Sequence, residues 1–267
     1  MALDRKNKIS SIAKAIDRSW RVLLAFFSAL LALFAWFLVT KFGDIPSFIF
    51  PTPREVWTRF LQVLRDGSLL FHTAVTLTEV LIGLSLGVSA AILIGYLLAK
   101  STTIERILSP YIVASQSIPI VAIAPLLIIW LGPGMLSKVL IGALIVFFPV
   151  LINTIVGIRS VSEELYELMH SLQATRWQIL TMLEVPAALP VFLGGLRIGA
   201  TLAVIGAVVG EFVGADQGLG FLINIGRGLY DTALVFVAVF TLIAMALLLY
   251  GAVVFLENRV LAWQKRP

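Results

Sequence analysis

Six long runs of mostly apolar residues constrain the fold of this chain more than any other feature. A helix needs about 20 such residues to cross the hydrocarbon core of a bilayer. The runs that reach this length are residues 22–40, 69–99, 107–131, 135–158, 190–213 and 232–256. Charged residues make up only 13% of the chain, whereas a typical soluble domain has about 25%. We therefore predict an all-α integral membrane protein with six transmembrane helices.

The Lys and Arg residues give the expected orientation, because cytoplasmic loops carry an excess of both. With the N-terminus inside, 14 of the 20 basic residues fall on the cytoplasmic side. We expect a cytoplasmic segment at 1–21, a six-span domain at 22–258 and a cytoplasmic tail at 259–267. The polar first twenty residues do not have the pattern of a cleavable signal peptide.

Two long connections are expected on the outer side. The first follows the first span, and its residues Thr52 and Pro53 predict the start of a short helix over 54–64. The second, 214–231, is rich in glycine and predicts a surface or re-entrant helix over 219–229.

The residue inventory argues against covalent chemistry. The chain has no cysteine, which excludes thiol nucleophiles and thiolate metal sites. Its two histidines, His72 and His170, lie in different segments. We expect no metal, no cofactor and no enzymatic activity. The basic residues behind the net charge of +5 flank the apolar runs, so we expect a lipid bilayer, and not nucleic acid, as their partner.

The connection at 159–189 is far more polar than the spans on either side of it. Two capping boxes predict helix starts, and they pair Ser160 with Glu163 and Thr175 with Gln178. The predicted elements are helix 163–172, a bend near Gln173 and Ala174, helix 176–185, and its end at Pro186.

Apolar residues recur at helical spacing within this loop. They are Leu165, Leu168, Met169, Leu172, Trp177, Leu180 and Leu183. A short amphipathic helix does not keep its shape alone in water. The loop must therefore pack on the ends of the spans, on a partner protein, or on both.

The loop resembles the EAA loop of ATP-binding-cassette (ABC) importer permeases. Glu167, Leu168 and Met169 occupy the Glu-Ala-Ala part of that pattern, Pro186 stands at its end, and Gln173 replaces a frequent glycine. Five further stretches, in the right order, resemble the nitrate/sulfonate/taurine branch of these permeases. They are PSFIFPTPREVW, TLTEVLIGLSLG, IPIVAIAPLLIIWLGPG, FFPVLINTIVGI and LRIGATLAVIGAVVGEFVGADQGLGFLI. The last stretch also resembles members assigned to pyrimidine-precursor or riboflavin uptake.

The resemblance implies a type I ABC importer permease of the cell inner membrane. In such a complex two permease copies form the path, two cytoplasmic ATPase subunits each receive a coupling loop, and an extracytoplasmic binding protein delivers the solute. The chain has no G-x-x-x-x-G-K-[ST] phosphate loop, so the ATPase must be a partner. The residues expected to couple to it are Glu163, Glu164, Glu167, Leu168, Met169, Gln173, Ala174, Arg176 and Pro186. The solute stays open between nitrate, an alkylsulfonate, a pyrimidine vitamin precursor and a flavin.

Polar residues within the apolar runs mark either helix contacts or a solute path, because they are costly in lipid. The candidate path-lining residues are Gln116, Ser117, Asn153 and Glu211. Glu79 fits a helix-to-helix contact better than a path. Arg197 either reaches the membrane interface or contacts the acidic residues of the loop. Pro119 and Pro125 are expected to kink the third span. The Gly and Ala residues of the fifth span favour close packing within one chain or between two copies.

A secondary transporter or a channel is the alternative function. It would need coupling-ion sites at broken helices in paired repeats, which the sequence does not indicate, and the amphipathic loop would have no purpose. A membrane-embedded enzyme would need a converging nucleophile, base or set of metal ligands.

Overall fold

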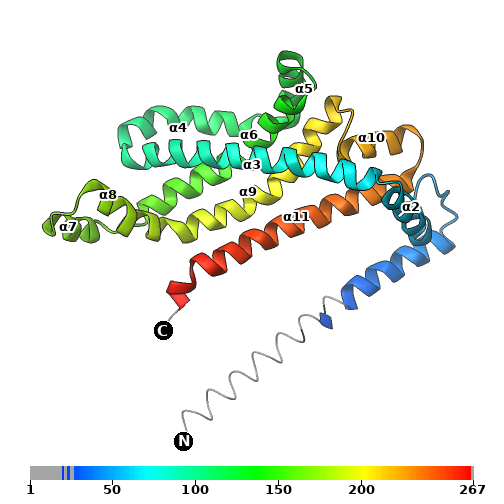
Figure 1. Ribbon diagram of the computed structural model, residues 1–267, viewed down its shortest axis with the longest axis horizontal. Coiled ribbons are helices and arrows are strands. Elements are labelled where there is room, and N and C mark those ends of the chain that lie inside the picture. The colour runs from blue at the N-terminus through cyan, green and yellow to red at the C-terminus, as the bar shows by residue number, and fades with distance from the viewer. Residues whose placement is uncertain (1–19, 21–22, 25–26, 266–267) are drawn as a thin grey trace, which may run out of the picture.

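The computed structural model describes residues 20, 23–24 and 27–265, and their secondary structure is entirely helical (Figure 1). The long helices are Phe27–Phe42, α3 (Ser68–Lys100), α4 (Thr102–Ser117), α6 (Met135–Arg159), α9 (Val185–Gly214) and α11 (Thr232–Val260). The shorter ones are α2 (Pro53–Arg65), α5 (Ile120–Leu131), α7 (Glu163–Ser171), α8 (Arg176–Ile179) and α10 (Leu219–Gly228). Figure 1 shows an elongated bundle, with α7 and α8 at one end and α2 and α10 at the other.

The number of spans differs from the expected six. Within the described residues, four helices are long and apolar enough to cross a membrane: α3, α6, the continuous helix Arg176–Gly214, and α11. The pair α4 and α5 passes the same test only together, as a broken span or a re-entrant loop. The first expected span, 22–40, lies partly outside the described residues. Of its described residues, 27–40 belong to the helix Phe27–Phe42, which is shorter than a membrane span. The count of six is therefore not confirmed.

The expected third span is not one kinked helix. Its axis turns by 93° between α4 and α5. Ile118 and Pro119 are extended at the break, with ψ values of 120° and 121°. A proline disfavours the helical conformation in the residue before it and has no N–H to continue the helical ladder. Pro125, by contrast, lies inside α5.

The core of the bundle is the close packing of α6 against α3 and α9. Glycines at the contact allow the backbones to approach, as small residues do in membrane helices. A Cβ atom on Gly206 of α9 would lie 2.6 Å from the Cα of Gly142 on α6. A Cβ on Gly87 of α3 would lie 2.6 Å from the carbonyl oxygen of Ala143 on α6. The small residues of the fifth span thus serve packing within one chain at this contact.

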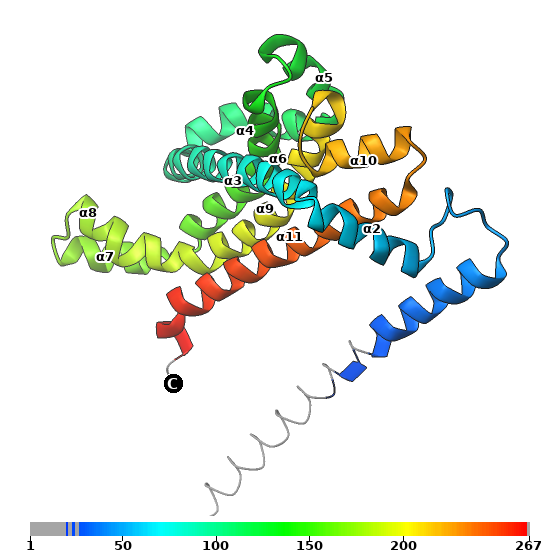
Figure 2. The same cartoon turned by 45° about the vertical axis from the view of Figure 1, so that its right-hand side comes forward.

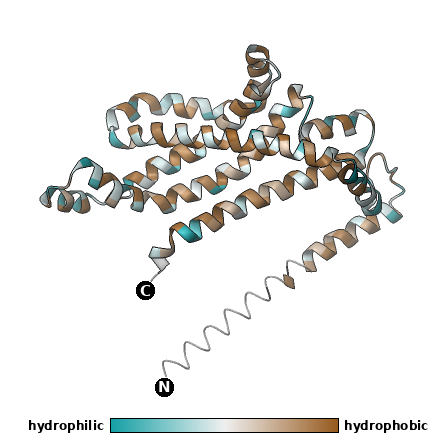
Figure 3. Cartoon of the chain, viewed as in Figure 1, coloured by the Kyte–Doolittle hydropathy of each residue, from teal (hydrophilic) through white to brown (hydrophobic). Residues whose placement is uncertain are grey.

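The outward faces of the bundle are apolar. Figure 3 shows hydrophobic residues along all the long helices, while hydrophilic residues gather near helix ends and loops. Large side chains such as Leu93, Ile129 and Leu248 are 67%, 75% and 74% exposed. Such continuous apolar surface is a feature of membrane or protein contact. It agrees with the membrane location expected from the sequence.

The helices predicted in the two connections expected on the outer side are present. Thr52 and Glu55 make a complete capping box at the start of α2, and α10 occupies most of the predicted 219–229. The first helix reaches the bundle through Trp36, whose ring stacks on Phe236 of α11 at 5.4 Å between centroids. In both views its N-terminal part lies apart from α3, α6 and α9 (Figures 1 and 2).

Candidate functional site

The bend of the polar loop is a helix C-terminal motif centred on Gln173. The N–H of Gln173 donates to the carbonyl of His170 at 2.9 Å, and that of Ala174 donates to the carbonyl of Met169 at 3.0 Å. This pair of bonds is the Schellman pattern, whose central residue is left-handed and usually glycine. Gln173 has φ of 54°, so it adopts the conformation that glycine takes most easily. The predicted bend is confirmed.

The second capping box of the loop is confirmed and the first is wrong. Thr175 and Gln178 exchange side-chain and backbone hydrogen bonds at the start of α8, at 2.7 and 3.3 Å. Ser160 instead follows the last turn of α6, where its hydroxyl donates to the carbonyl of Gly157 at 2.7 Å. The residue before α7 is Ser162, and among the described residues its side chain makes no capping hydrogen bond.

Pro186 does not end the second loop helix, contrary to the prediction. The helix runs without interruption from Arg176 to Gly214 and becomes the fifth span. A π-helical turn, Leu180–Glu184, precedes Pro186 in this helix. A proline inside a helix removes one hydrogen bond and clashes with a preceding carbonyl. The wider π-turn accommodates that local disruption, so the loop helix and the fifth span form one continuous helix.

The predicted coupling residues lie mainly on the surface at this end of the bundle. Glu163, Glu164, Glu167, Leu168, Gln173 and Arg176 are exposed, whereas Met169, Ala174 and Pro186 are half-buried. Leu168 is 54% exposed, and Trp177 and Met182 are each 70% exposed. The apolar face of the loop is thus largely free of contacts within the described chain. The role of these residues in coupling stays a prediction.

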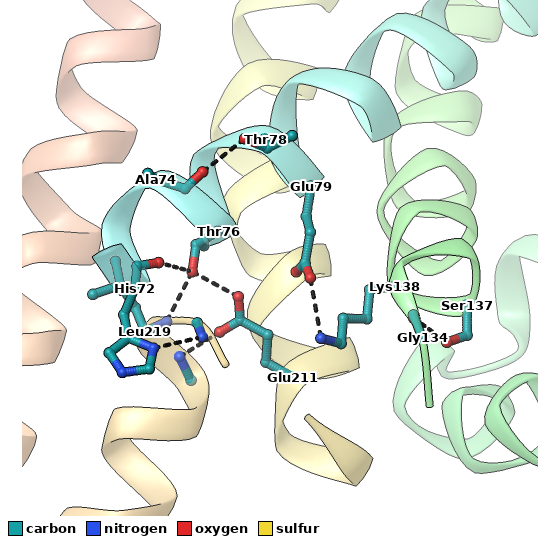
Figure 4. A network of polar contacts seen from close by, with 12 residues as sticks. His72, Ala74, Thr76, Thr78, Glu79, Gly134, Ser137, Lys138, Glu211 and Leu219 are labelled. Atoms are coloured by element: carbon teal, nitrogen blue, oxygen red, sulfur yellow. Dashed lines mark hydrogen bonds and ion pairs between the residues drawn. The ribbon is translucent and has the colours of Figure 1, made fainter. Parts of the chain in front are cut away.

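A buried ion pair joins α3 to α6, and Figure 4 shows its side chains. Lys138 of α6 contacts Glu79 of α3, with 3.1 Å between Nζ and Oε1, and their side chains are 5% and 3% exposed. Two charges removed from water in this way are tolerated only when they pair closely. Glu79 therefore joins α3 to α6. Its partner could not be identified from the sequence, because Lys138 was counted there as a charge outside the spans.

Glu211 of α9 lies beside this pair and holds the start of α10. Its carboxylate accepts hydrogen bonds from the Thr76 hydroxyl, at 2.6 Å, and from the backbone N–H of Gly220. The N–H of Leu219 donates to Thr76 Oγ1 at 2.8 Å, and the N–H of Gly218 donates to His72 Nδ1 at 3.0 Å. Free N–H groups at a helix start favour a carboxylate. We call Thr76, Glu79, Lys138 and Glu211 the outer cluster, after the side of the membrane on which the sequence predicts it.

The two glycines at the start of α10 are required by this geometry. Gly218 has φ of 109°, and a Cβ on Gly220 would lie 2.8 Å from Glu211 Oε2. Glu211 is fully buried. The glycine-rich outer segment is thereby folded onto α3 and α9, and His72 and Thr76 are contacts that sequence reasoning missed.

The structure does not bring the four path candidates together by direct hydrogen bonds. Gln116 lines a groove of about 550 Å³ between α4 and α6, next to Ile112 and Arg159. The Ser117 hydroxyl donates to the Val113 carbonyl at 3.1 Å. The candidates on the other helices are placed differently: the Asn153 amide donates to the Pro149 carbonyl at 2.8 Å, and Glu211 belongs to the outer cluster. Path lining stays a prediction for all four.

Arg197 does not contact the acidic residues of the loop. Its guanidinium pairs with Glu257 of α11 at 2.9 Å. Because α9 and α11 are neighbours in the bundle, the nearest carboxylate to Arg197 belongs to the last span. The idea of a contact with the coupling loop was wrong.

A family model described as "binding-protein-dependent transport system inner membrane component" matches residues 83–262. The riboflavin transport system permease protein RibX of Chloroflexus aurantiacus is 45% identical, over 96% of each chain. The formylaminopyrimidine transport permease protein ThiX of Halalkalibacterium halodurans is 35% identical, over 94% of this chain and all of the relative.

More distant relatives extend the comparison. The taurine transport system permease protein TauC of Escherichia coli is 30% identical over 92% of this chain and 91% of the relative. A solved chain from an inward-facing structure of the MetNI methionine ABC transporter superposes with a TM-score of 0.56 at 19% identity, covering 77% of this chain and 98% of that chain. This last similarity concerns the fold.

Proposed function

The chain belongs to the family of binding-protein-dependent transport system inner membrane components and is the permease subunit of an ABC importer for a small solute, and we propose that this solute is a flavin or a related pyrimidine-type vitamin precursor. The permease is not itself an enzyme, because in this family partner subunits hydrolyse ATP. It is a multi-pass protein of the inner membrane. No finding supports the alternative of a secondary transporter or channel.

The similarity to a riboflavin permease carries the proposal on the solute. It reaches 45% identity across 96% of both chains, against 30% for the taurine permease. The formylaminopyrimidine permease, at 35% identity, favours a pyrimidine precursor as the second candidate. Both solutes contain a pyrimidine-type ring, which differs strongly in shape and charge from nitrate or a sulfonate.

An uptake assay tests the choice of solute. The chain is produced with its ATPase and its binding protein in a riboflavin-requiring host that lacks its own riboflavin transporter. We expect saturable uptake of labelled riboflavin that disappears when the ATPase loses its phosphate-loop lysine. Uptake of a formylaminopyrimidine alone selects the second candidate, and uptake of labelled taurine alone contradicts the proposal.

The loop at 159–189 is proposed to be the ATPase-docking element. Support comes from its exposed apolar residues Leu168 and Trp177, and from the continuous helix that joins the loop to the fifth span. A continuous helix of this kind can transmit a displacement of the loop directly to the fifth span. The same proposal assigns coupling to Glu163, Glu164, Glu167, Met169, Gln173, Ala174, Arg176 and Pro186.

The complex is proposed to contain two copies of this chain, two ATPase subunits and one outer binding protein. Both termini, 1–21 and 259–267, then lie in the cytoplasm, as the distribution of basic residues favours. The path is proposed to lie between the two copies, with Gln116, Ser117 and Asn153 facing it and Glu211 acting at its outer end. Cross-linking of a cysteine at position 116 between two copies, on solute addition, checks the lining.

A further inference from the structure

We propose that Glu184 is a positioning residue for energy coupling, because it joins α7 to the ends of two spans. The three residues involved, Lys100, Tyr166 and Glu184, are called the Glu184 latch. The inference rests on the proposed docking of the loop to an ATPase. It adds to that function the contact by which movement of α7 reaches α3 and α9.

Three segments meet at one oxygen atom of Glu184. Lys100, the last residue of α3, forms an ion pair with Glu184 Oε1. The Tyr166 hydroxyl of α7 donates to the same oxygen at 3.2 Å. The Lys100 ammonium also lies over the Tyr166 ring, 5.0 Å from its centroid, a distance typical of cation–π attraction. Burial raises the pKa of Tyr166, so its hydroxyl keeps the proton that it donates.

Tyr166 is the main polar link of α7 to the spans. Among the described residues, it is the α7 side chain that hydrogen-bonds a residue of the Arg176–Gly214 helix. The acidic residues of the first turn of α7, Glu163 and Glu164, are exposed. A displacement of α7 would therefore act on the transmembrane helices through Tyr166 as well as through the backbone of the loop.

The position of Glu184 suits the transmission of movement from α7 to the transmembrane helices. It is the last residue of the π-turn Leu180–Glu184, and single π-turns inside helices are frequent at functional sites. Its side chain is 2% exposed. It borders an apolar groove of about 500 Å³ between α3, α6 and α9, whose lining includes Leu93, Ala188 and Phe192. Low polarity around a charge pair strengthens its attraction and fixes its geometry.

Stability alone does not explain a carboxylate at this position. A buried ion pair often contributes no more than apolar residues of the same volume. Glu184 Oε2 has no hydrogen-bond partner among the described residues, which is a cost that an apolar side chain would avoid. What the carboxylate provides is a directed link from the loop to α3, and this is why we assign it to coupling.

The decisive experiment compares transport with ATP hydrolysis in the full complex. Glu184→Gln and Tyr166→Phe are placed in the permease, and the complex with ATPase and binding protein is reconstituted in vesicles. We expect both complexes to assemble and hydrolyse ATP, while riboflavin transported per ATP falls by roughly fivefold or more in Glu184→Gln, the lower end of usual coupling between sites. Tyr166→Phe, which keeps the ion pair, should lower the ratio less.

Two controls separate positioning from mere structural support. Glu257→Gln breaks the Arg197–Glu257 pair, which also joins two helices and is partly buried at 32% and 21%; it should leave transport per ATP unchanged. Lys100→Arg keeps the positive charge, so the amount of riboflavin transported per ATP should stay close to that of the unmodified complex. A Glu184→Gln complex with a lower melting temperature but an unchanged ratio overturns the proposal.

The outcomes also separate this inference from the function on which it rests. If the unmodified chain fails to bind an ATPase, the proposed docking is wrong. If the unmodified complex couples normally and Glu184→Gln and Tyr166→Phe couple equally well, only the latch is wrong. If Glu184→Gln does not fold, Tyr166→Phe alone decides, and an unchanged ratio in it counts against the latch.

Discussion

Each end of the bundle has a lysine–glutamate pair, and the two pairs differ in how completely they are enclosed. In the outer cluster the side chains of Lys138 and Glu79 are 5% and 3% exposed, and Glu211 beside them binds the backbone of α10. In the Glu184 latch the glutamate is buried but Lys100 is 38% exposed. The outer pair is locked between packed helices, whereas the inner pair borders a loop with an open apolar face. The difference suggests that the end with the outer cluster is rigid and that the end with the Glu184 latch is adjustable. We call these the outer and inner ends, after the orientation that the basic residues favour.

Replacement of Lys138 in the outer cluster should have the largest effect of the variants that test this difference. Lys138→Met leaves Glu79 buried without a partner, which costs about 3–5 kcal/mol when one member of a buried pair is removed. We expect a large fall in the melting temperature of the purified permease. The double variant Lys138→Met/Glu79→Leu should recover much of the loss, since no uncompensated charge remains. Equal melting temperatures for Lys138→Met and the unmodified chain would contradict the rigid outer end.

The substitution Glu211→Gln tests the second part of the outer cluster. An amide accepts only through its one oxygen, so the Thr76 hydroxyl or the N–H of Gly220 loses its acceptor on residue 211. The Thr76 hydroxyl also lies 3.2 Å from the carbonyl oxygen of His72, whereas an unpaired N–H of Gly220 would cost up to about 3 kcal/mol. We expect lower thermal stability and reduced uptake. Unchanged uptake at normal expression ends the idea that Glu211 acts at the outer end of the path. Asn224→Ala removes the hydrogen bond from a half-buried residue of α10 to the Phe212 carbonyl of α9, and it is a matched control for general loosening of that helix.

At the inner end, Leu168→Asp should affect binding and not folding. Leu168 is 54% exposed, so stability of the isolated permease should change little. If the side chain is buried against an ATPase, its loss weakens the complex by about 2 kcal/mol, as for a central interface residue. Co-purification with the ATPase measures this, and Leu168→Met, which keeps an apolar side chain, serves as control. Normal complex formation and normal uptake would refute the docking assignment.

The smallest effect is expected at the bend of the loop. Gln173 has φ of 54°, and a glycine there should stabilise the folded loop by about 1 kcal/mol. Gln173→Gly should slow hydrogen exchange of the amides of Gln173 and Ala174, whose N–H groups form the Schellman bonds. Gln178→Gly, placed in the capping box of α8, should have the opposite effect. Faster exchange in Gln173→Gly would show that the glutamine side chain itself stabilises the bend.

Local features were predictable because they depend on residues close in the sequence. Thr175 with Gln178, Thr52 with the first turn of α2, and the bend at Gln173 each involve contacts over a few positions. Two local predictions failed where a neighbouring helix competed. Ser160 hydrogen-bonds the last turn of α6 and does not cap α7. Pro186 does not end the loop helix, because a π-turn before it lets the helix continue into the fifth span.

The sequence by itself determined that this chain is helical, lies in a membrane and carries a polar loop that resembles a permease coupling element. Length and hydropathy suffice for the first two conclusions, because a bilayer accepts only segments that satisfy their own backbone hydrogen bonds. The third rests on the resemblance of Glu167, Leu168, Met169 and Pro186 to the family pattern. Only the tertiary structure decided which polar groups meet. Thr76 reaches Glu211 across 135 residues and Lys100 reaches Glu184 across 84. Helix packing determines these long-range partners, and no local sequence pattern predicts how the helices pack.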